Sequence, residues 1–299
     1  MTAREWIPNI DLGEDYDSRY RGARLHYDGL RNLAEHFGRK MPVHRHAQSG
    51  QIHFIESGRV SFHIEDQLYD VEGPCLFFTP PAVPHSFETE PSATGHVLTL
   101  HQTFLWKIAQ WTGEPEIDRA LGYRLCLSAA SIRQDQAASW EQIWALICRI
   151  RDEWQGGGLA REFVLETQVA LLLTLLGRLS DVAEVSLETN NEELSIYNRF
   201  VREVELHYRE HWVIPQYLQV LGLSERRLNA ICQRISHTTP KQLIRERVLS
   251  EARRLLAFTG KSANEIAYEI GFADPAYFSR FFRRTTGMTP LQYREQAVR

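Results

Sequence analysis

The sequence predicts a β + α two-domain protein. We expect an N-terminal β-barrel with following helices, and a C-terminal all-α domain in which a long helix joins two similar pairs of short helices. A length of 299 residues suggests about two domains. The composition, 43% hydrophobic and 24% charged, is typical of globular chains. Short alternating runs occupy the first third, whereas capped runs with helical periodicity occupy the last.

The predicted barrel covers residues 20–105. Apolar and polar side chains alternate along residues 51–56 and again along residues 60–64, with a Ser-Gly turn between them. Two further apolar runs, at 76–78 and 97–100, are separated by turns that contain proline. Regularly spaced short strands with such turns are typical of a small barrel or sandwich.

Residues 106–180 are expected to form helices that support the barrel and pair two protomers. Large apolar side chains recur at helical spacing along residues 140–150, and three consecutive glycines end that helix. A second helix, over residues 163–179, has an apolar face wide enough for core packing and for a dimer surface. Residues 181–193 are polar and acidic, which is typical of an interdomain linker.

Charge is distributed unevenly along the chain. The net charge is −4, but residues 211–299 carry 14 Lys and Arg against 7 Asp and Glu. A basic region on an acidic body indicates a C-terminal part that binds a polyanion. The N-terminus lacks an export signal, no apolar run reaches the ~18 residues of a membrane span, and the four cysteines are scattered. We therefore expect a cytoplasmic protein with no membrane partner.

Residues 264–286 carry the pattern of a helix-turn-helix. A helix over 264–270 is followed by a turn at Gly271 and by a helix from Pro275 to Thr286, which Asp274 caps. The second helix of such a unit can enter the major groove of DNA. The side chains expected to contact DNA from it are Tyr277, Arg280, Arg283 and Arg284.

Residues 215–235 repeat this design. A helix over 215–221 turns at Gly222, and Ser224 caps a helix over 225–235. Between the two units, residues 240–258 predict a helix roughly 28 Å long. This length lets the two reading helices meet successive major-groove turns, about 34 Å apart, although a plain helical bundle with solvated arginines gives a similar pattern. The side chains expected to contact DNA from the first unit are Arg226, Asn229 and Gln233.

The run IAYEIGFADPAYFSRFFRRTTGMTPLQYR, residues 266–294, resembles the signature of AraC/XylS-family transcription regulators. The resemblance covers about residues 195–296 and implies a DNA-binding domain over 194–299. It also implies base contacts from Arg280, Arg226 and Asn229. The first unit departs from the family pattern in its packing positions. These departures are Leu218 for a small Ala, Cys232 for Phe and His237 for Gly.

Residues 38–58 resemble the first cupin motif, in the form Gly38-x5-His44-x-His46-x4-Gln51-x6-Gly58, with Gln51 in the place of the usual acid. A looser second motif runs from Gly73 to His85. The resemblance implies a cupin-like barrel that binds an effector. The stretches MPVHRHAQ and FFTPPAVPHSF are most similar to regulators of aromatic-acid catabolism, which implies an effector such as 4-hydroxyphenylacetate or 4-hydroxybenzoate.

The histidine pattern leaves three interpretations open. On one strand, His44 and His46 would share a face, and His85 and Gln51 would complete the group. Such a group can hold Zn²⁺ or Fe²⁺, can hydrogen-bond the carboxylate or phenol of a ligand, or can be an ordinary polar core. No cofactor is assigned on this pattern alone. Candidate cations for an anionic effector are Arg24 and Arg45, and candidate aromatic lining residues are Phe54, Phe62, Phe77, Phe78 and Phe87.

The sequence thus predicts a ligand-responsive transcriptional activator, not an enzyme. An effector in the barrel would shift the balance between two arrangements of the DNA-binding half. The expected partners are operator DNA, a small aromatic acid, RNA polymerase and a second copy of the chain. The alternatives are a metal-dependent cupin enzyme fused to a DNA-binding domain and a purely architectural DNA-binding protein. The sequence contains no nucleophile elbow, phosphate-binding glycine loop or HExxH motif.

Overall fold

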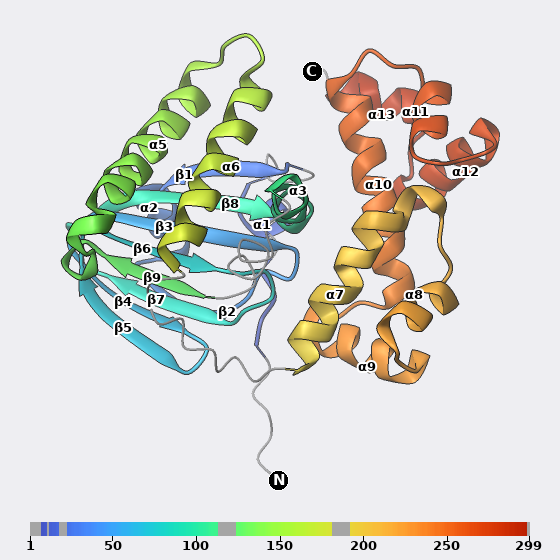
Figure 1. Ribbon diagram of the computed structural model, residues 1–299. Helices are drawn as coiled ribbons and strands as arrows, with labels where there is room; N and C mark the ends of the chain where they lie inside the picture. The colour runs from blue at the N-terminus through green and yellow to red at the C-terminus, as the bar shows by residue number, and fades with distance from the viewer. Residues whose placement is uncertain (1–6, 11, 18–22, 113–123, 181–191, 298–299) are drawn as a thin grey trace. The chain divides into compact units, whose positions relative to one another are not determined.

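The computed structural model describes residues 7–10, 12–17, 23–112, 124–180 and 192–297 (Figure 1). The chain forms two compact units that divide between Asn190 and Asn191. The first unit combines β-sheets with helices, and the described part of the second unit is helical. This confirms the predicted fold class. Among the described helices, none is long and apolar enough to span a membrane.

The first unit is built on two antiparallel sheets that pack face to face. Phe62 of one sheet stacks on Phe77 of the other with ring centroids 4.4 Å apart, so side chains of both sheets fill the space between them. The five-stranded sheet has the order β1 (Leu25–Gly29), β8 (Thr94–His101), β3 (Ser49–Ser57), β6 (Cys75–Thr79), β9 (Leu125–Ser128). The four-stranded sheet has the order β2 (Lys40–His44), β7 (His85–Thr89), β4 (Arg59–Ile64), β5 (Gln67–Glu72).

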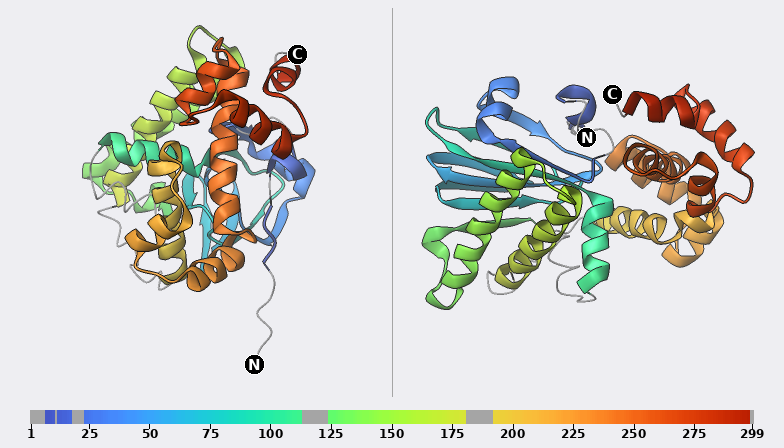
Figure 2. Two further views of the ribbon diagram at one scale, coloured as in Figure 1. Left: turned by 90° about the vertical axis from the view of Figure 1, so that its right-hand side faces the viewer. Right: turned by 90° about the horizontal axis from the view of Figure 1, so that it is seen from above.

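Two long helices, α5 (Ala137–Gly156) and α6 (Arg161–Ser180), lie side by side over the outer face of the five-stranded sheet (Figures 1 and 2). Their buried side chains, Ile147 and Leu172 among them, share one core cluster with Leu98 of the sheet. Each such side chain contributes about 1.5–3 kcal/mol when fully buried, which fixes the helices to the sheet. The shorter elements of this unit are α1 (Leu12–Asp15), α2 (Leu30–Phe37), α3 (Gln102–Thr112), η2 (Ala129–Ser131) and η3 (Gln134–Gln136).

Two sequence-based expectations for this unit need correction. The stretch 106–180 is not helical throughout, because β9 pairs with β6 at the edge of the sheet. Phe54 and Phe78 do not line the barrel, since they belong to the cluster beneath the helices. Adjacent residues of a strand point to opposite faces, so Phe77 faces inward and Phe78 outward. The expected linker lies outside the described residues except for its last two, which begin a helix.

The second unit contains seven α-helices in its described part, together with a short 3₁₀ turn, η4 (Tyr208–Glu210). Side chains of Ser224, Thr239, Ser262 and Asp274 accept hydrogen bonds from backbone amides at the starts of four helices, so the expected caps are present. The helices are α7 (Glu192–His207), α8 (Ile214–Leu221), α9 (Glu225–Ser236), α10 (Pro240–Phe258), α11 (Ala263–Glu269), α12 (Pro275–Thr286) and α13 (Pro290–Ala297).

The turn between α11 and α12 requires glycine. Gly271 has a φ of +89°, and a Cβ there would lie 1.8 Å from the carbonyl oxygen of Arg209. This close approach brings α12 against the core, where Phe278 and Phe282 are fully buried. His237, which stands where the family pattern has Gly, ends α9 with a left-handed φ of 56°. The backbone therefore keeps the glycine-type conformation at that helix end without glycine.

Candidate ligand site and nucleic-acid interface

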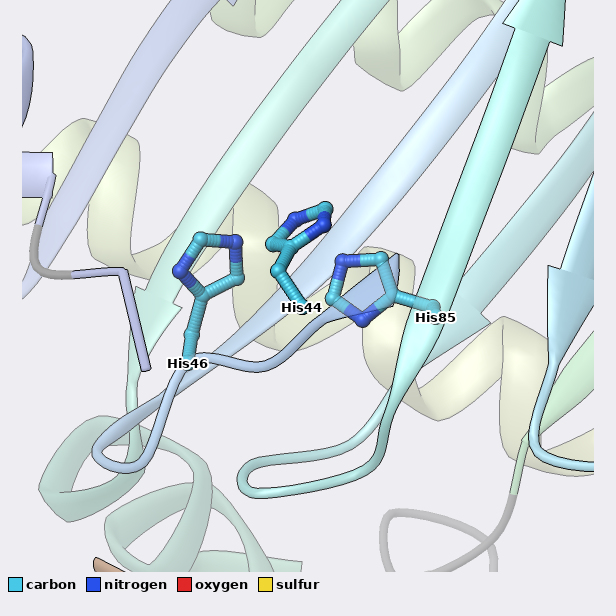
Figure 3. A group of neighbouring side chains, drawn as sticks. All are labelled: His44, His46 and His85. Carbon is cyan, nitrogen blue, oxygen red and sulfur yellow. The ribbon is translucent and has the colours of Figure 1, made fainter. Parts of the chain in front are cut away.

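Three histidines meet inside the first unit (Figure 3). His44 ends β2, His85 begins β7 opposite it, and His46 lies in the loop that follows β2. The ring centroid of His44 lies 4.3 Å from that of His85 and 5.0 Å from that of His46. One ligand atom from each ring can be chosen so that all three lie within 4.8 Å of one another. The strand ends before His46, but the three rings converge as the motif predicts.

Backbone carbonyls determine which nitrogen of each ring carries the proton. The Nδ1 atoms of His44, His46 and His85 lie 2.8, 2.8 and 3.0 Å from carbonyl oxygens. A carbonyl can only accept, so each Nδ1 donates, and in the neutral ring Nε2 keeps its lone pair. Nε2 of His85 is buried without a hydrogen-bond partner among the described residues. The cluster therefore presents lone pairs rather than N–H donors.

Burial keeps these rings neutral. Loss of solvent lowers the pKa of His44 to about 4, with a further contribution from nearby His46, and it lowers the pKa of His46 to about 4. The pKa of His85 is lowered well below its usual value by burial and by the neighbouring imidazoles. A cluster of buried neutral imidazoles whose Nε2 atoms carry lone pairs can accept hydrogen bonds or bind a metal ion.

Gln51 and His53 extend the site along β3. Gln51 hydrogen-bonds to His46, and its amide nitrogen donates to Thr99 Oγ1 at 3.1 Å. His53 is buried with its ring 6.2 Å from that of His85, and burial lowers its pKa to about 3. Sequence reasoning missed His53. The available signal was its position two residues after Gln51, because residues i and i+2 of a strand share a face.

The N-terminal segment also reaches this site, which the sequence did not indicate. The carbonyl oxygen that accepts from His46 Nδ1 belongs to Ile10. Asn9 forms a parallel bridge with Arg45, and its side chain accepts from the backbone amide of Ala47 at 2.7 Å. Residues 7–10 therefore help to hold the loop that carries His46.

The two candidate cations have different surroundings from those expected. Arg24 donates to Glu166 of α6 at 2.9 Å, and Lys107 of α3 donates to the same carboxylate at 3.0 Å. This ion pair joins the start of the sheet to α6, so Arg24 has a structural partner. Arg45 is buried, and its backbone pairs with the N-terminal segment.

The second unit presents α12 as an exposed helix. Its inner side buries Phe278 and Phe282, whereas Tyr277, Arg280 and Arg284 are exposed at i, i+3 and i+7. Residues at this spacing share one helix face. Arg280 lies 3.6 Å from Asp274. Arg283 is exposed on the flank of the same helix.

In the first helix-turn-helix of the same unit, α9 is exposed in a similar way. Arg226, Asn229 and Gln233 again follow the i, i+3, i+7 spacing, with Arg226 and Gln233 exposed and Asn229 half-buried. Leu228 and Ile231 are buried beneath them. The two helix-turn-helix units are joined by α10, which has the bounds expected from the sequence. The seven predicted DNA-contact residues therefore lie on the outer sides of two reading helices.

Family models match both units. An AraC-like ligand-binding domain matches residues 30–153, and a helix-turn-helix domain matches residues 217–296. Among curated proteins, the chain is 31% identical over 94 residues to the uncharacterized HTH-type transcriptional regulator YisR of Bacillus subtilis. It is 34% identical over 124 residues to the HTH-type transcriptional activator RhaS of an Enterobacter species. The matches cover 31% and 42% of this chain, and the chain spans only 33% and 43% of those relatives.

Solved structures give weaker likenesses. The xylose-binding transcription activator XylR is 22% identical with a TM-score of 0.32, over 44% of this chain and 39% of that one. ToxT from Vibrio cholerae, bound to an unsaturated fatty acid, is 15% identical with a TM-score of 0.39, over 90% of this chain and 94% of that one. At these TM-scores neither likeness carries an argument about function. The chain therefore combines an AraC-like ligand-binding domain with a helix-turn-helix domain, and the curated relatives that it resembles are HTH-type transcriptional regulators.

Proposed function

We propose that this protein binds duplex DNA through α9 and α12 and regulates transcription in response to a small molecule held in the barrel. The observation that carries the proposal is the pair of helix-turn-helix units joined by α10, each with polar or basic side chains on its exposed side. A helix of this type reads base edges in the major groove while flanking side chains contact phosphates. Binding of chromosomal DNA would place the protein in the cytoplasm, with RNA polymerase as a further partner.

The chemistry of the histidine cluster limits what it can bind. Because His44, His46 and His85 present lone pairs, they cannot donate hydrogen bonds to a carboxylate. Their complementary partners are a metal ion or a hydroxyl group that donates. Three lone pairs within 4.8 Å of one another exceed what one hydroxyl can satisfy, which favours a divalent metal.

The residues present fit such a metal. His44, His46 and His85 would hold Zn²⁺ or Fe²⁺ through Nε2, with Nδ1 of each fixed by a carbonyl as is common for histidine ligands. The bound ion would supply a Lewis acid for an oxygen atom of the effector. Gln51 lies beside this group, where its amide can orient His46 or contact the effector.

The barrel interior supports a small aromatic acid as the effector. Phe62 stacks against Phe77 and also against Phe87, with ring centroids 4.4 and 5.6 Å apart, and the His85 ring lies nearly parallel to that of Phe62. Such faces suit a benzenoid guest. A phenol hydroxyl would face the histidine cluster directly, whereas the carboxylate would face it only through the ion. This proposal selects 4-hydroxyphenylacetate and 4-hydroxybenzoate as first candidates.

Thermal unfolding of the full chain tests the effector. At ten times its Kd, a ligand stabilises the fold by about 1.4 kcal/mol, which raises the Tm by about 3–6 °C for a domain of this size. We expect 4-hydroxyphenylacetate to raise the Tm more than phenylacetate, which has the same ring and carboxylate but no hydroxyl. If sugars raise the Tm and no aromatic acid does, the proposal of an aromatic effector is wrong. The DNA-binding proposal does not depend on this result.

The exposed side of α6 is proposed to pair two protomers. Phe163 is 68% exposed and Leu171 is 50% exposed, and their spacing places both on one side of the helix. Exposed apolar groups gathered in this way mark interaction surfaces. We expect the double substitution F163E/L171E to convert a dimer into a monomer in sedimentation equilibrium. A145E on the exposed side of α5 is the control, and dimers that survive F163E/L171E would place the contact elsewhere.

A metal-dependent enzyme is the alternative function. The named relatives are transcription regulators, which favours the regulatory reading. Oxygen uptake by the metal-loaded chain with 4-hydroxyphenylacetate would support the enzyme instead.

A further inference from the structure

Two arginines of the first reading helix are held by the first two residues of α7. Arg227 Nη2 lies 2.7 Å from Glu192 Oε1. Arg234 donates two hydrogen bonds to the Glu193 carboxylate, at 2.9 and 2.6 Å. Both arginine side chains are 46% exposed, so solvent and other anions can reach them. Exposed ion pairs of this kind contribute little to the free energy of folding, so stability alone does not account for them.

The paired arginines lie on the flank of α9. Each residue of a helix turns by about 100°, so Arg227 and Arg234, seven residues apart, share one side. That side lies about a quarter turn from Arg226 on the reading face and about as far from the buried Leu228. When a reading helix lies in the major groove, its flanks face the phosphate backbones.

The second helix-turn-helix differs from the first in this respect. On α12, Arg280 lies 3.6 Å from Asp274, and both side chains are more than half exposed. Arg283 and Arg284 are also exposed. The short, two-bonded contact between Arg234 and Glu193 therefore sets α9 apart from α12. Arg227 and Arg234 of α9 have the close carboxylate contacts, at 2.7 and 2.6 Å, whereas the contact of Arg280 on α12 is longer at 3.6 Å.

We infer that Glu192 and Glu193 mask the phosphate-facing flank of α9, so that the first helix-turn-helix contributes fewer phosphate contacts than its arginines would allow. The two carboxylates compete with DNA phosphates for Arg227 and Arg234. They also repel the DNA backbone that approaches this flank. This inference rests on the proposed DNA-binding function. It identifies Glu192 and Glu193 as two residues that lower the affinity for DNA.

Salt-dependent binding of the full chain to a random-sequence duplex tests the mask. Such a probe needs no operator, because non-specific affinity depends on phosphate contacts. We expect E192Q/E193Q to bind about tenfold tighter at moderate salt. The slope of log K against log salt concentration should become steeper by about 1–2, since each added phosphate contact changes it by about 0.9. The control variant E246Q/E295Q removes two negative charges from α10 and α13. It should change the affinity and the salt slope much less than E192Q/E193Q does.

A double-mutant cycle separates masking from support of the helix. In the wild-type background R227Q/R234Q should change random-duplex affinity by less than about twofold, because these arginines are already occupied. In the E192Q/E193Q background the same change should remove most of the gain in affinity, leaving only the part that comes from the lost repulsion between the carboxylates and the DNA backbone. Circular dichroism melts check that each variant folds.

The outcomes distinguish this inference from the proposed function. If the wild-type chain shows no salt-dependent binding to duplex DNA, the DNA-binding proposal itself fails. If wild type binds but E192Q/E193Q binds equally well or more weakly, the carboxylates position α9 and the mask is overturned. A large loss from R227Q/R234Q in the wild-type background would also overturn it, because the arginines would then already contact phosphates.

Discussion

The variant H85Q is expected to lose the tight binding of Zn²⁺ that we propose for this protein. Wild-type protein should bind about one equivalent, because three Nε2 lone pairs of His44, His46 and His85 converge. Removal of one of three protein ligands should weaken binding by at least about 100-fold, since even loss of a partner behind a metal ligand costs 10–100-fold. Glutamine approximates the size of histidine and limits the cavity that a smaller residue would leave.

Competition with a chromophoric zinc chelator and metal analysis of protein purified without chelators measure this effect. H53Q is the matched control, because His53 is equally buried and lies beside His85 but does not belong to the converging group. Metal removal should also lower the Tm. A ligand present at 1,000 times its Kd stabilises by about 4.1 kcal/mol, equivalent to about 8–16 °C for a domain of this size.

The metal proposal would be wrong if the purified wild-type protein contained less than about a tenth of an equivalent of metal and bound no Zn²⁺ on titration. The lone pairs of the cluster would then be available to hydroxyl donors of the effector. Equal affinities in wild type, H85Q and H53Q would place the ion at another site. Either result would leave the helix-turn-helix units and their proposed role unaffected.

The histidine cluster shows which parts of a site a sequence can predict. His44, His46 and His85 could be predicted from the motif spacing, which places His44 and His85 on neighbouring strands and His46 just after the first of them. The Nδ1 partner of His46 was not identified, because Ile10 is far away in sequence and contributes only a backbone carbonyl. His53 was missed because it lies outside the positions that define the motif, although its place two residues after Gln51 puts it on the same face of the strand.

The same limits apply to the fold. The bounds of α10 and α12 agree with the sequence because Pro at the first turn and Thr239 or Asp274 before it give strong local signals. Strand β9 has four residues and is defined by pairing with β6, a non-local contact that local patterns do not report. The prediction that both Phe77 and Phe78 line the barrel was wrong for Phe78. In a continuous run of apolar residues, the sequence does not show which side chains face inward.

The variant R280A should weaken binding to a selected operator by about 1–3 kcal/mol and relax the sequence preference of the protein. Arg280 is 69% exposed on α12, and the fully buried Phe278 and Phe282 anchor the opposite side of that helix. A guanidinium in this position can donate two hydrogen bonds to a guanine edge, which alanine cannot. Asp274 is close enough to orient Arg280 before DNA arrives.

The measurement compares affinities for a duplex selected by the wild-type chain and for a random duplex. R283A, on the flank of α12, is the matched control: it should weaken both complexes alike and lower the salt slope by about 0.9. R280A should instead lose affinity mainly for the selected duplex, because base contacts specify whereas phosphate contacts position. Equal losses of R280A on both duplexes would make Arg280 a phosphate contact. The base-reading role would then pass to Tyr277 or Arg284, which share its helix face.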